Sequence, residues 1–130
     1  MTKRLTICEL VVTAGIAGTG STTSDKVYRG EIKSIYIVHG AASAATTDTT
    51  IAAEILSGVS RNVLVIANSN ASLQYQPQAQ VHTSTGAGAV YIAAGEPVLT
   101  FPIVCGRITA SVADQTNTKV VTVYVYIDEY

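Results

Sequence analysis

Charged and aromatic residues are scarce in this 130-residue sequence. Lys, Arg, Asp and Glu make up 13% of it, about half the share found in an ordinary globular protein. A salt-rich solvated shell therefore cannot cover much of the surface, and Thr, Ser, Ala, Gly and Val must take its place. Such surfaces are typical of proteins that pack against neighbours over much of their area. The formal net charge of -1 gives no reason to expect nucleic acid as a partner.

Signals for membranes, secretion and disulfides are also missing. No stretch reaches the roughly 20 apolar residues of a membrane span, so we expect no membrane partner. Lys3 and Arg4 precede an apolar run, but Glu9 interrupts it, so we expect synthesis in a cytoplasm rather than secretion. Cys8 and Cys105 are too few for a disulfide framework and lack metal-ligand spacing. We expect two reduced, partly buried thiols.

Residue patterns that carry catalysis are absent as well. His39 and His82 are the only histidines, and neither has Cys, Asp or Glu at the spacing of metal ligands. They are expected to be surface or hydrogen-bonded imidazoles. The many serines include no GxSxG motif of a nucleophilic serine. The sequence pattern places no second carboxylate beside Glu54 to form a pair for hydrolysis. We expect a protein that is not an enzyme, with no catalytic residue, cofactor or metal.

The stretch from 119 to 128, KVVTVYVYID, organises the rest of the chain. It is rich in β-branched and aromatic residues, and side chains alternate across a strand with period two. One face of this predicted strand carries Val121, Val123, Val125 and Ile127, and the other carries Val120, Thr122, Tyr124, Tyr126 and Asp128. A domain of this size needs one of these faces for its core. The second must meet another sheet, a loop or another subunit.

Similar alternation, bounded by turn residues, predicts further strands along the chain. The strand at 26–40 is long enough that Gly30 is expected to mark a bulge or bend, and Pro77 places the strand 73–83 at a sheet edge or a bulge. The run at 62–67 is continuous in apolar residues and predicts a buried strand. The predicted strands lie at 5–13, 26–40, 51–57, 62–67, 73–83, 89–94, 103–113 and 119–128, and Pro102 separates a shorter piece at 98–101 from the strand at 103–113.

The segment 51–57 is ambiguous. Asp48 could cap a helix in which Ile51 meets Ile55, with Gly58 ending it. The same residues also alternate as a strand, which we favour because every neighbour is β. The sequence therefore predicts one all-β domain over residues 1–130, a sandwich or barrel of seven to eight mainly antiparallel strands. Gly, Ser, Thr and Ala predict flexible loops at about 14–25 and 40–50.

Several segments together resemble small β-rich virion proteins of tailed bacteriophages. They are the Gly/Ser/Thr-rich loop after the first strand, GEIKSIYIVHG at 30–40, TTDTTI at 46–51 and VTVYVYIDE at 121–129. Within that group the chain looks most like the capsid decoration, or cement, proteins. The resemblance implies a jelly-roll-like sandwich or barrel that assembles as dimers or trimers. Such proteins bind the outside of the major capsid lattice and stabilise it, so the expected location is the virion exterior.

The resemblance and the two-faced C-terminal strand together suggest two surfaces. We expect a subunit interface at Val120, Tyr124 and Tyr126. We expect loops that contact the major capsid protein, with Ile16, Thr19, Ser21, Thr22, Ala42, Ser43 and Thr46.

Two alternatives remain open. A tail or connector subunit would be the nearest one, and ring formation would mark it. A carbohydrate- or receptor-binding β module would need aromatic and carboxamide side chains at one end of the sandwich. The segment NSNASLQYQPQAQ at 68–80 is its only candidate.

Overall fold

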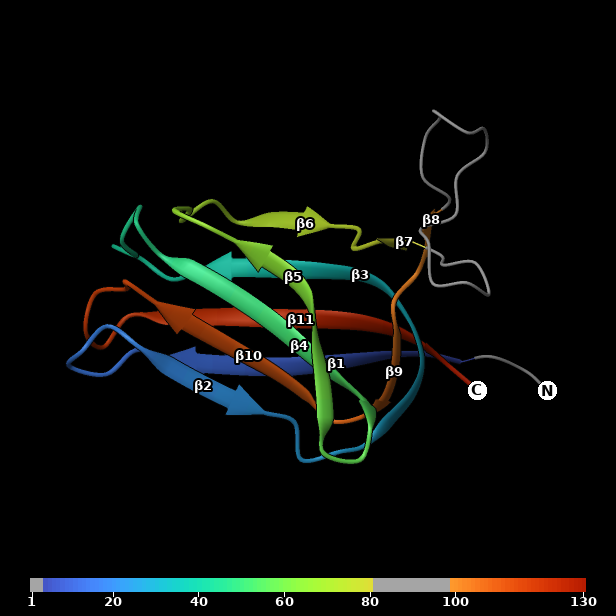
Figure 1. Ribbon diagram of the computed structural model, residues 1–130. Coiled ribbons are helices and arrows are strands. Elements are labelled where there is room, and N and C mark those ends of the chain that lie inside the picture. The colour runs from blue at the N-terminus through green and yellow to red at the C-terminus, as the bar shows by residue number, and fades with distance from the viewer. Residues whose placement is uncertain (1–3, 81–98) are drawn as a thin grey trace.

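The part of the chain that the computed structural model describes, residues 4–80 and 99–130, consists of strands and connections without a helix. Five strands form a sheet in the order β1-β11-β3-β6, with β9 also paired to β3, and four form a sheet in the order β2-β10-β4-β5. The two sheets pack face to face (Figure 1). The strands are β1 (Arg4–Thr13), β2 (Gly20–Thr23), β3 (Tyr28–His39), β4 (Asp48–Leu56), β5 (Val59–Ile66), β6 (Leu73–Tyr75), β7 (Ala79–Gln80), β8 (Leu99–Thr100), β9 (Ile103–Gly106), β10 (Ile108–Ala113) and β11 (Val120–Glu129).

The arrangement of eight of these strands is that of a jelly roll. The connections from β1 to β2, from β3 to β4 and from β10 to β11 each cross from one sheet to the other. Every strand pair is antiparallel. Orders β1-β11-β3-β6 and β2-β10-β4-β5 match the two sheets of a jelly roll, an architecture shared by viral capsid domains, lectins and cupins. The predicted jelly-roll-like sandwich is confirmed, and the fold by itself does not decide the function.

The C-terminal strand β11 lies between β1 and β3 and supplies the middle of the core. Its inward side chains, Val121, Val123, Val125 and Ile127, are all 0% exposed. Full burial of a side chain of this size stabilises the fold by about 1.5–3 kcal/mol. The predicted division of this strand into two faces is confirmed, because its other side chains remain half-buried on the outside.

A bulge in β3 changes which of its residues enter the core. Lys33 is an extra residue opposite a register shift in β11. The extra residue reverses the alternation, so Ile32 before it and Ile35 after it are both buried. The sequence prediction put this bulge at Gly30, and that position is wrong by three residues.

The ambiguous segment 51–57 belongs to strand β4, as favoured. Ile51 and Ala53 face the core with no exposed surface. Its neighbour β5 is the outermost strand of the four-stranded sheet, and Val59 and Val65 are exposed. The predicted strand at 62–67 is present in β5, but it is not fully buried, because Val63, Leu64 and Ile66 are only partly covered by the core. A continuous apolar run does not distinguish a central strand from an edge strand whose outer side chains lack a neighbour.

Both segments predicted to be irregular loops contain part of a strand. Strand β2 lies within 14–25 and pairs with β10, while β4 begins at Asp48 within 40–50. Thr22 donates its hydroxyl to the carbonyl of Val11, at 2.7 Å, and so ties β2 to the edge of the other sheet. Gly/Ser/Thr composition suggested a loop, but threonine is a good strand former and its hydroxyl can bridge strands.

Two predicted strands are interrupted. Between β6 and β7 the chain leaves the sheet around Pro77, which is buried. Residues 81–83, the predicted strand 89–94 and Val98 lie outside the described residues. Gly106 separates β9 from β10 and lets the chain pass from the five-stranded to the four-stranded sheet. Its φ of 152° and the 2.6 Å that would separate an added Cβ from Cβ of Glu54 both require glycine there.

Candidate functional site

The outward face of the five-stranded sheet is largely apolar and carries three tyrosines. Cross-strand neighbours on this face include Ile7 opposite Tyr126 and Val11 opposite Thr122. We call this surface the tyrosine face. It consists of outward side chains of β1, β3 and β11, namely Leu5, Ile7, Glu9, Val11, Tyr36, Val38, Val120, Thr122, Tyr124 and Tyr126.

Two tyrosine rings form the centre of the tyrosine face. Tyr36 lies directly opposite Tyr124, with ring centroids 6.5 Å apart and planes inclined by 38°. Tilted aromatic pairs at this distance are worth about 0.5–1.5 kcal/mol beyond the area they bury. Val120, Tyr124 and Tyr126, the predicted interface residues, all lie on this face and are half-buried. Val120 lies at its margin, opposite Thr13.

Strand β1 adds apolar surface that the sequence prediction did not include in the interface. Leu5, Ile7 and Val11 are 61%, 52% and 46% exposed. Their alternation with the buried Cys8, Leu10 and Val12 was visible in the sequence and is confirmed. The sequence did not show that β1 lies beside β11, because only the strand order of the sheet reveals this.

The tyrosine face has the size and chemistry of a contact surface. Glu9 is the only charged side chain among these residues, and Asp128, opposite Leu5, lies on the same outward face at its margin. Three strands about 4.8 Å apart and about 33 Å long cover about 500 Å² before side-chain relief is counted. Apolar patches of about 300–600 Å² are the largest that ordinary monomers expose, and they often mark interaction sites.

The outward face of the four-stranded sheet is different, because hydroxyl groups line it. The Ser21 and Ser111 hydroxyls lie 3.3 Å apart across β2 and β10, and those of Thr23 and Thr109 lie 2.9 Å apart. Hydroxyls are readily hydrated, so this face is stable in water without a cover. Of the two outward faces, the tyrosine face is therefore the one that gains from a partner.

Gln115 joins three loops at one end of the sandwich (Figure 1). Its buried side chain accepts a hydrogen bond from the backbone N–H of Ala44 at 2.9 Å and donates to the hydroxyl of Ser43 at 3.2 Å. Its own backbone N–H donates to the carbonyl of Gly18 at 3.0 Å. The two loops predicted to contact a capsid thus lie together, held by the turn at 114–118.

The predicted capsid-contact residues do not all reach the surface. Ile16 is the most prominent, with 95% of its surface exposed. Ser43 is buried against Gln115, so its side chain is not available to a partner, and Thr22 is half-buried on β2. The remaining four are exposed, namely Thr19, Ser21, Ala42 and Thr46.

Ionisable groups with catalytic potential do not gather in the described part of the chain, which holds no group of three or more His, Cys, Asp or Glu residues placed to bind a metal. Burial lowers the pKa of the half-buried His39, whose Nδ1 atom has no hydrogen-bond partner among the described residues. His82 lies outside the described residues. Cys8 is buried and Cys105 is exposed, both as free thiols, so partial burial of Cys105 was wrong.

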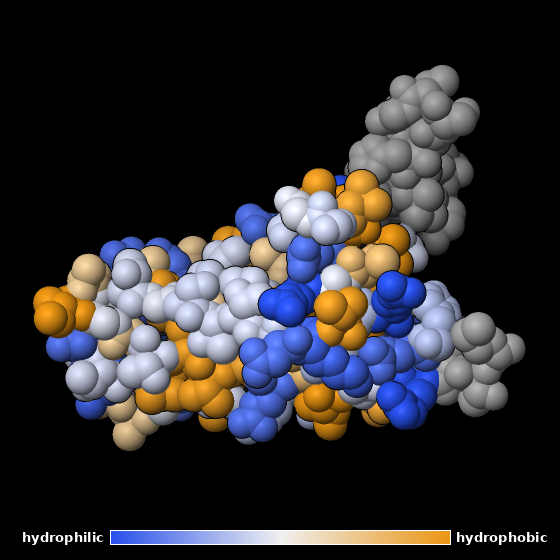
Figure 2. Space-filling model, turned by 90° about the horizontal axis from the view of Figure 1, so that it is seen from below, coloured by the Kyte–Doolittle hydropathy of each residue, from blue (hydrophilic) through white to orange (hydrophobic). Residues whose placement is uncertain are grey.

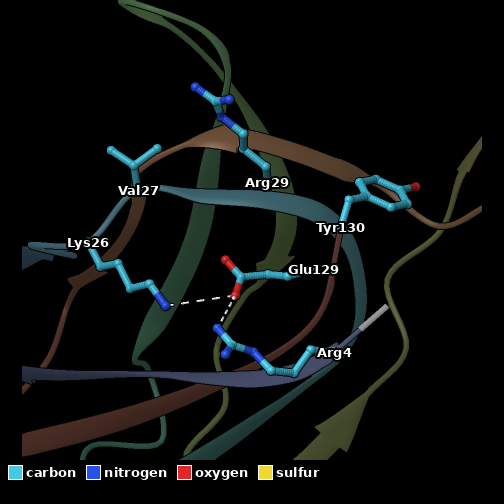
Figure 3. Close-up of a pocket in the computed structure, with 6 residues that line it drawn as sticks. All are labelled: Arg4, Lys26, Val27, Arg29, Glu129 and Tyr130. Atoms are coloured by element: carbon cyan, nitrogen blue, oxygen red, sulfur yellow. Dashed lines mark ion pairs between the residues drawn. The ribbon is translucent and has the colours of Figure 1, made fainter. Parts of the chain in front are cut away.

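Glu129 is a carboxylate held by three donors near the end of β11. The Thr6 hydroxyl donates to Oε2 at 2.7 Å, and the side-chain nitrogens of Arg4 and Lys26 lie 3.6 and 3.7 Å from the same oxygen (Figure 3). The hydrogen bond from Thr6, followed by the nearby positive charges, lowers the pKa of Glu129. This cluster ties the start of β1 and the β2–β3 connection to the C-terminal strand.

Acidification should therefore weaken the fold through Glu129. Because the folded-state pKa is lowered, its contribution to stability is present above the ordinary glutamate pKa and is lost as the pH falls through the folded value. The melting temperature, followed by circular dichroism from pH 7 to pH 3, should fall less steeply in Glu129→Gln than in the wild type. Asp25→Asn, which removes an exposed loop carboxylate, is the control and should keep the wild-type slope. Equal slopes for wild type and Glu129→Gln would contradict this assignment.

Comparison of the chain with protein-family models, with curated proteins and with solved structures found no match.

Proposed function

We propose that this chain is a non-enzymatic virion structural protein, a capsid decoration protein that binds the outside of a major capsid lattice and stabilises it. The observation that carries the proposal is the tyrosine face, a largely apolar and aromatic sheet surface on an otherwise complete jelly roll. A second copy covering this face would give the expected homo-oligomer, a dimer or a trimer. Decoration proteins repeat a modest contact many times, so no single contact has to be strong.

The end of the sandwich where Gln115 joins the loops, which we call the loop end, supports the proposed binding to the capsid. Ile16 projects from the loop between β1 and β2, while Gln115 orders the backbone beneath it. A loop that is already held in place loses little conformational entropy when it docks. An almost fully exposed isoleucine on such a support is suited to insertion into a pocket of a neighbouring protein.

The carbohydrate-binding alternative finds less support in its only candidate segment. Tyr75, the single tyrosine of that segment, is half-buried and packs against the core. A sugar-stacking platform needs an exposed ring face, and residues 68–80 present no other aromatic side chain.

Co-sedimentation with capsids stripped of their small proteins tests the proposal. The wild-type chain should bind saturably, in a fixed ratio to the major capsid protein. Ile16→Glu should bind at least about tenfold more weakly, since placing an unpaired carboxylate in a contact costs more than about 1.4 kcal/mol. Leu56→Glu is the matched control, because Leu56 is 64% exposed in the hairpin at the far end of β4.

Three outcomes separate the possibilities. Binding by wild type and Leu56→Glu but not by Ile16→Glu supports the decoration role and the loop end as the contact. Equal binding by all three removes the loop end from the contact. No binding by a wild-type chain that forms closed rings overturns the decoration role in favour of a tail or connector subunit.

A further inference from the structure

Two hollows adjoin at the end of the sandwich near the chain ends, away from the loops that Gln115 joins. One has a volume of about 440 Å³ and is lined by Arg4, Lys26, Glu129 and Tyr130 together with Val27 and Arg29. The other, of about 490 Å³, shares Val27 and Arg29 and adds Glu54, Cys105 and Arg107. Figure 2 shows that hydrophilic residues gather in the same half of the molecule as the chain ends, whereas the other half is paler.

The hollows concentrate positive charge in a chain that is slightly negative. Their lining holds four of the eight Lys and Arg residues but only two of the nine Asp and Glu residues. They therefore carry a formal charge of +2, and the rest of the chain carries -3. This separation makes the hollows attractive to an anionic partner.

Both carboxylates in the lining are already engaged. Glu129 is held by Thr6, Arg4 and Lys26. Glu54 accepts the backbone N–H of Arg107 at Oε1, at 2.9 Å, and that of Gly58 at Oε2, at 3.1 Å. The backbone hydrogen bonds from Arg107 and Gly58, and after them the positive charge of Arg107, lower the pKa of Glu54. Neither carboxylate can form a direct ion pair with a further cation without losing its hydrogen bonds.

Two guanidinium groups consequently face solvent with no carboxylate within ion-pair distance in the described ranges 4–80 and 99–130. Arg29 and Arg107 are exposed and line the same hollow. In Figure 3, Arg4 and Lys26 converge on Glu129, whereas the Arg29 side chain points away from it. The guanidinium group is planar and matches a carboxylate through two parallel hydrogen bonds.

We infer that the hollow between Arg29 and Arg107 is a docking site for an Asp- or Glu-bearing segment of a partner protein. Val27, at 49% exposure, offers an apolar contact beside the two arginines, which suits a peptide better than a bare anion. The inference does not depend on self-association through the tyrosine face.

A capped hexaglutamate peptide is the probe for this site. Titrated into the ¹⁵N-labelled protein, it should shift the backbone amide signals of Gly106 and Arg107 saturably. Raising the salt concentration should weaken binding, because the contact is between exposed charges. The double variant Arg29→Gln/Arg107→Gln should bind at least about tenfold more weakly.

The matched control removes two positive charges elsewhere. Arg61→Gln/Lys119→Gln has the same net charge as the double variant, but neither residue lines the hollows. It should bind hexaglutamate as the wild type does, and melting temperatures should show that both variants are folded. If both double variants bound hexaglutamate equally weakly, net charge alone would explain the loss of affinity, and the proposed site would be refuted.

Two further outcomes would also overturn the inference. One is the absence of saturable shifts with hexaglutamate. The other is tighter binding of inorganic phosphate or of a thymidine hexanucleotide, which would assign the hollow to phosphate groups. Repeating the titration on Tyr124→Lys separates a failure of this site from a failure of self-association.

Discussion

Replacing Tyr124 by lysine should abolish the proposed self-association and leave a monomer of 13.5 kDa. Tyr124 lies at the centre of the tyrosine face, where its ring pairs with that of Tyr36. An ammonium group there would have to be desolvated against a second apolar face that offers only Glu9 as a counter-charge. Light scattering coupled to size exclusion, at a protein concentration where the wild type is fully associated, measures the change. We expect at least about a thirtyfold rise in the dissociation constant, since loss of a central aromatic anchor typically costs more than about 2 kcal/mol.

The control for this experiment is Val65→Lys. Val65 is 58% exposed on β5, so it also places a lysine at an exposed apolar position, but in the four-stranded sheet. This variant should keep the wild-type mass, and both variants should melt close to the wild type because the changed side chains point outward. A monomeric wild type, or a Tyr124→Lys variant that keeps its native mass, would refute the tyrosine face as the subunit interface.

The core strands were predictable because they have β-branched residues at alternate positions and lack a competing helical periodicity. In β11 the side chains from Val121 to Ile127 are β-branched at alternate positions, and no helical periodicity competes. The inner face of β1 follows the same rule. A long amphipathic strand at the centre of a sheet therefore identifies itself from local sequence, and it identifies its outward face as well.

The departures arise where tertiary context decides. The bulge at Lys33 depends on the register with β11, which no local pattern reports. Strand β2 exists because β10 offers it a partner, although its residues Gly20 to Thr23 read as a loop. Gln115 looked like an ordinary turn residue, yet its amide is buried between two loops.

The tyrosine face was easier to predict from the sequence than the hollow between Arg29 and Arg107, because strand pairing builds the hollow. Tyr124 and Tyr126 belong to one strand, so alternation placed them on a common face. Arg29 and Arg107 lie 78 positions apart in the chain and meet only because β9 pairs with β3. Surfaces made by one element can be inferred from sequence, whereas those made by strand pairing require the topology.

Replacing Gly30 by alanine should have the largest effect on stability. Gly30 lies in β3 between Glu129 of β11 and Val104 of β9. An added Cβ would lie 2.1 Å from the carbonyl oxygen of Asp128 and 2.8 Å from its carbonyl carbon. Both are backbone atoms of the central strand, so relief requires the sheet to separate rather than a side chain to turn. We expect a loss of more than about 3 kcal/mol, a fall of about 10 °C or more in melting temperature.

Gly15→Ala is the matched control, because the nearest atom to its added Cβ is the carbonyl oxygen of Thr19, at an ordinary 3.6 Å. It should melt within about 2 °C of the wild type or slightly higher, since alanine restricts the unfolded chain. Because Arg29 and Glu129 flank the contact at Gly30, Gly30→Ala should also weaken hexaglutamate binding, which Gly15→Ala leaves unchanged. A Gly30→Ala variant as stable as the wild type would mean that β3 and β11 do not approach this closely. The hollow between Arg29 and Arg107, which is partly lined by β3, would then have a different shape.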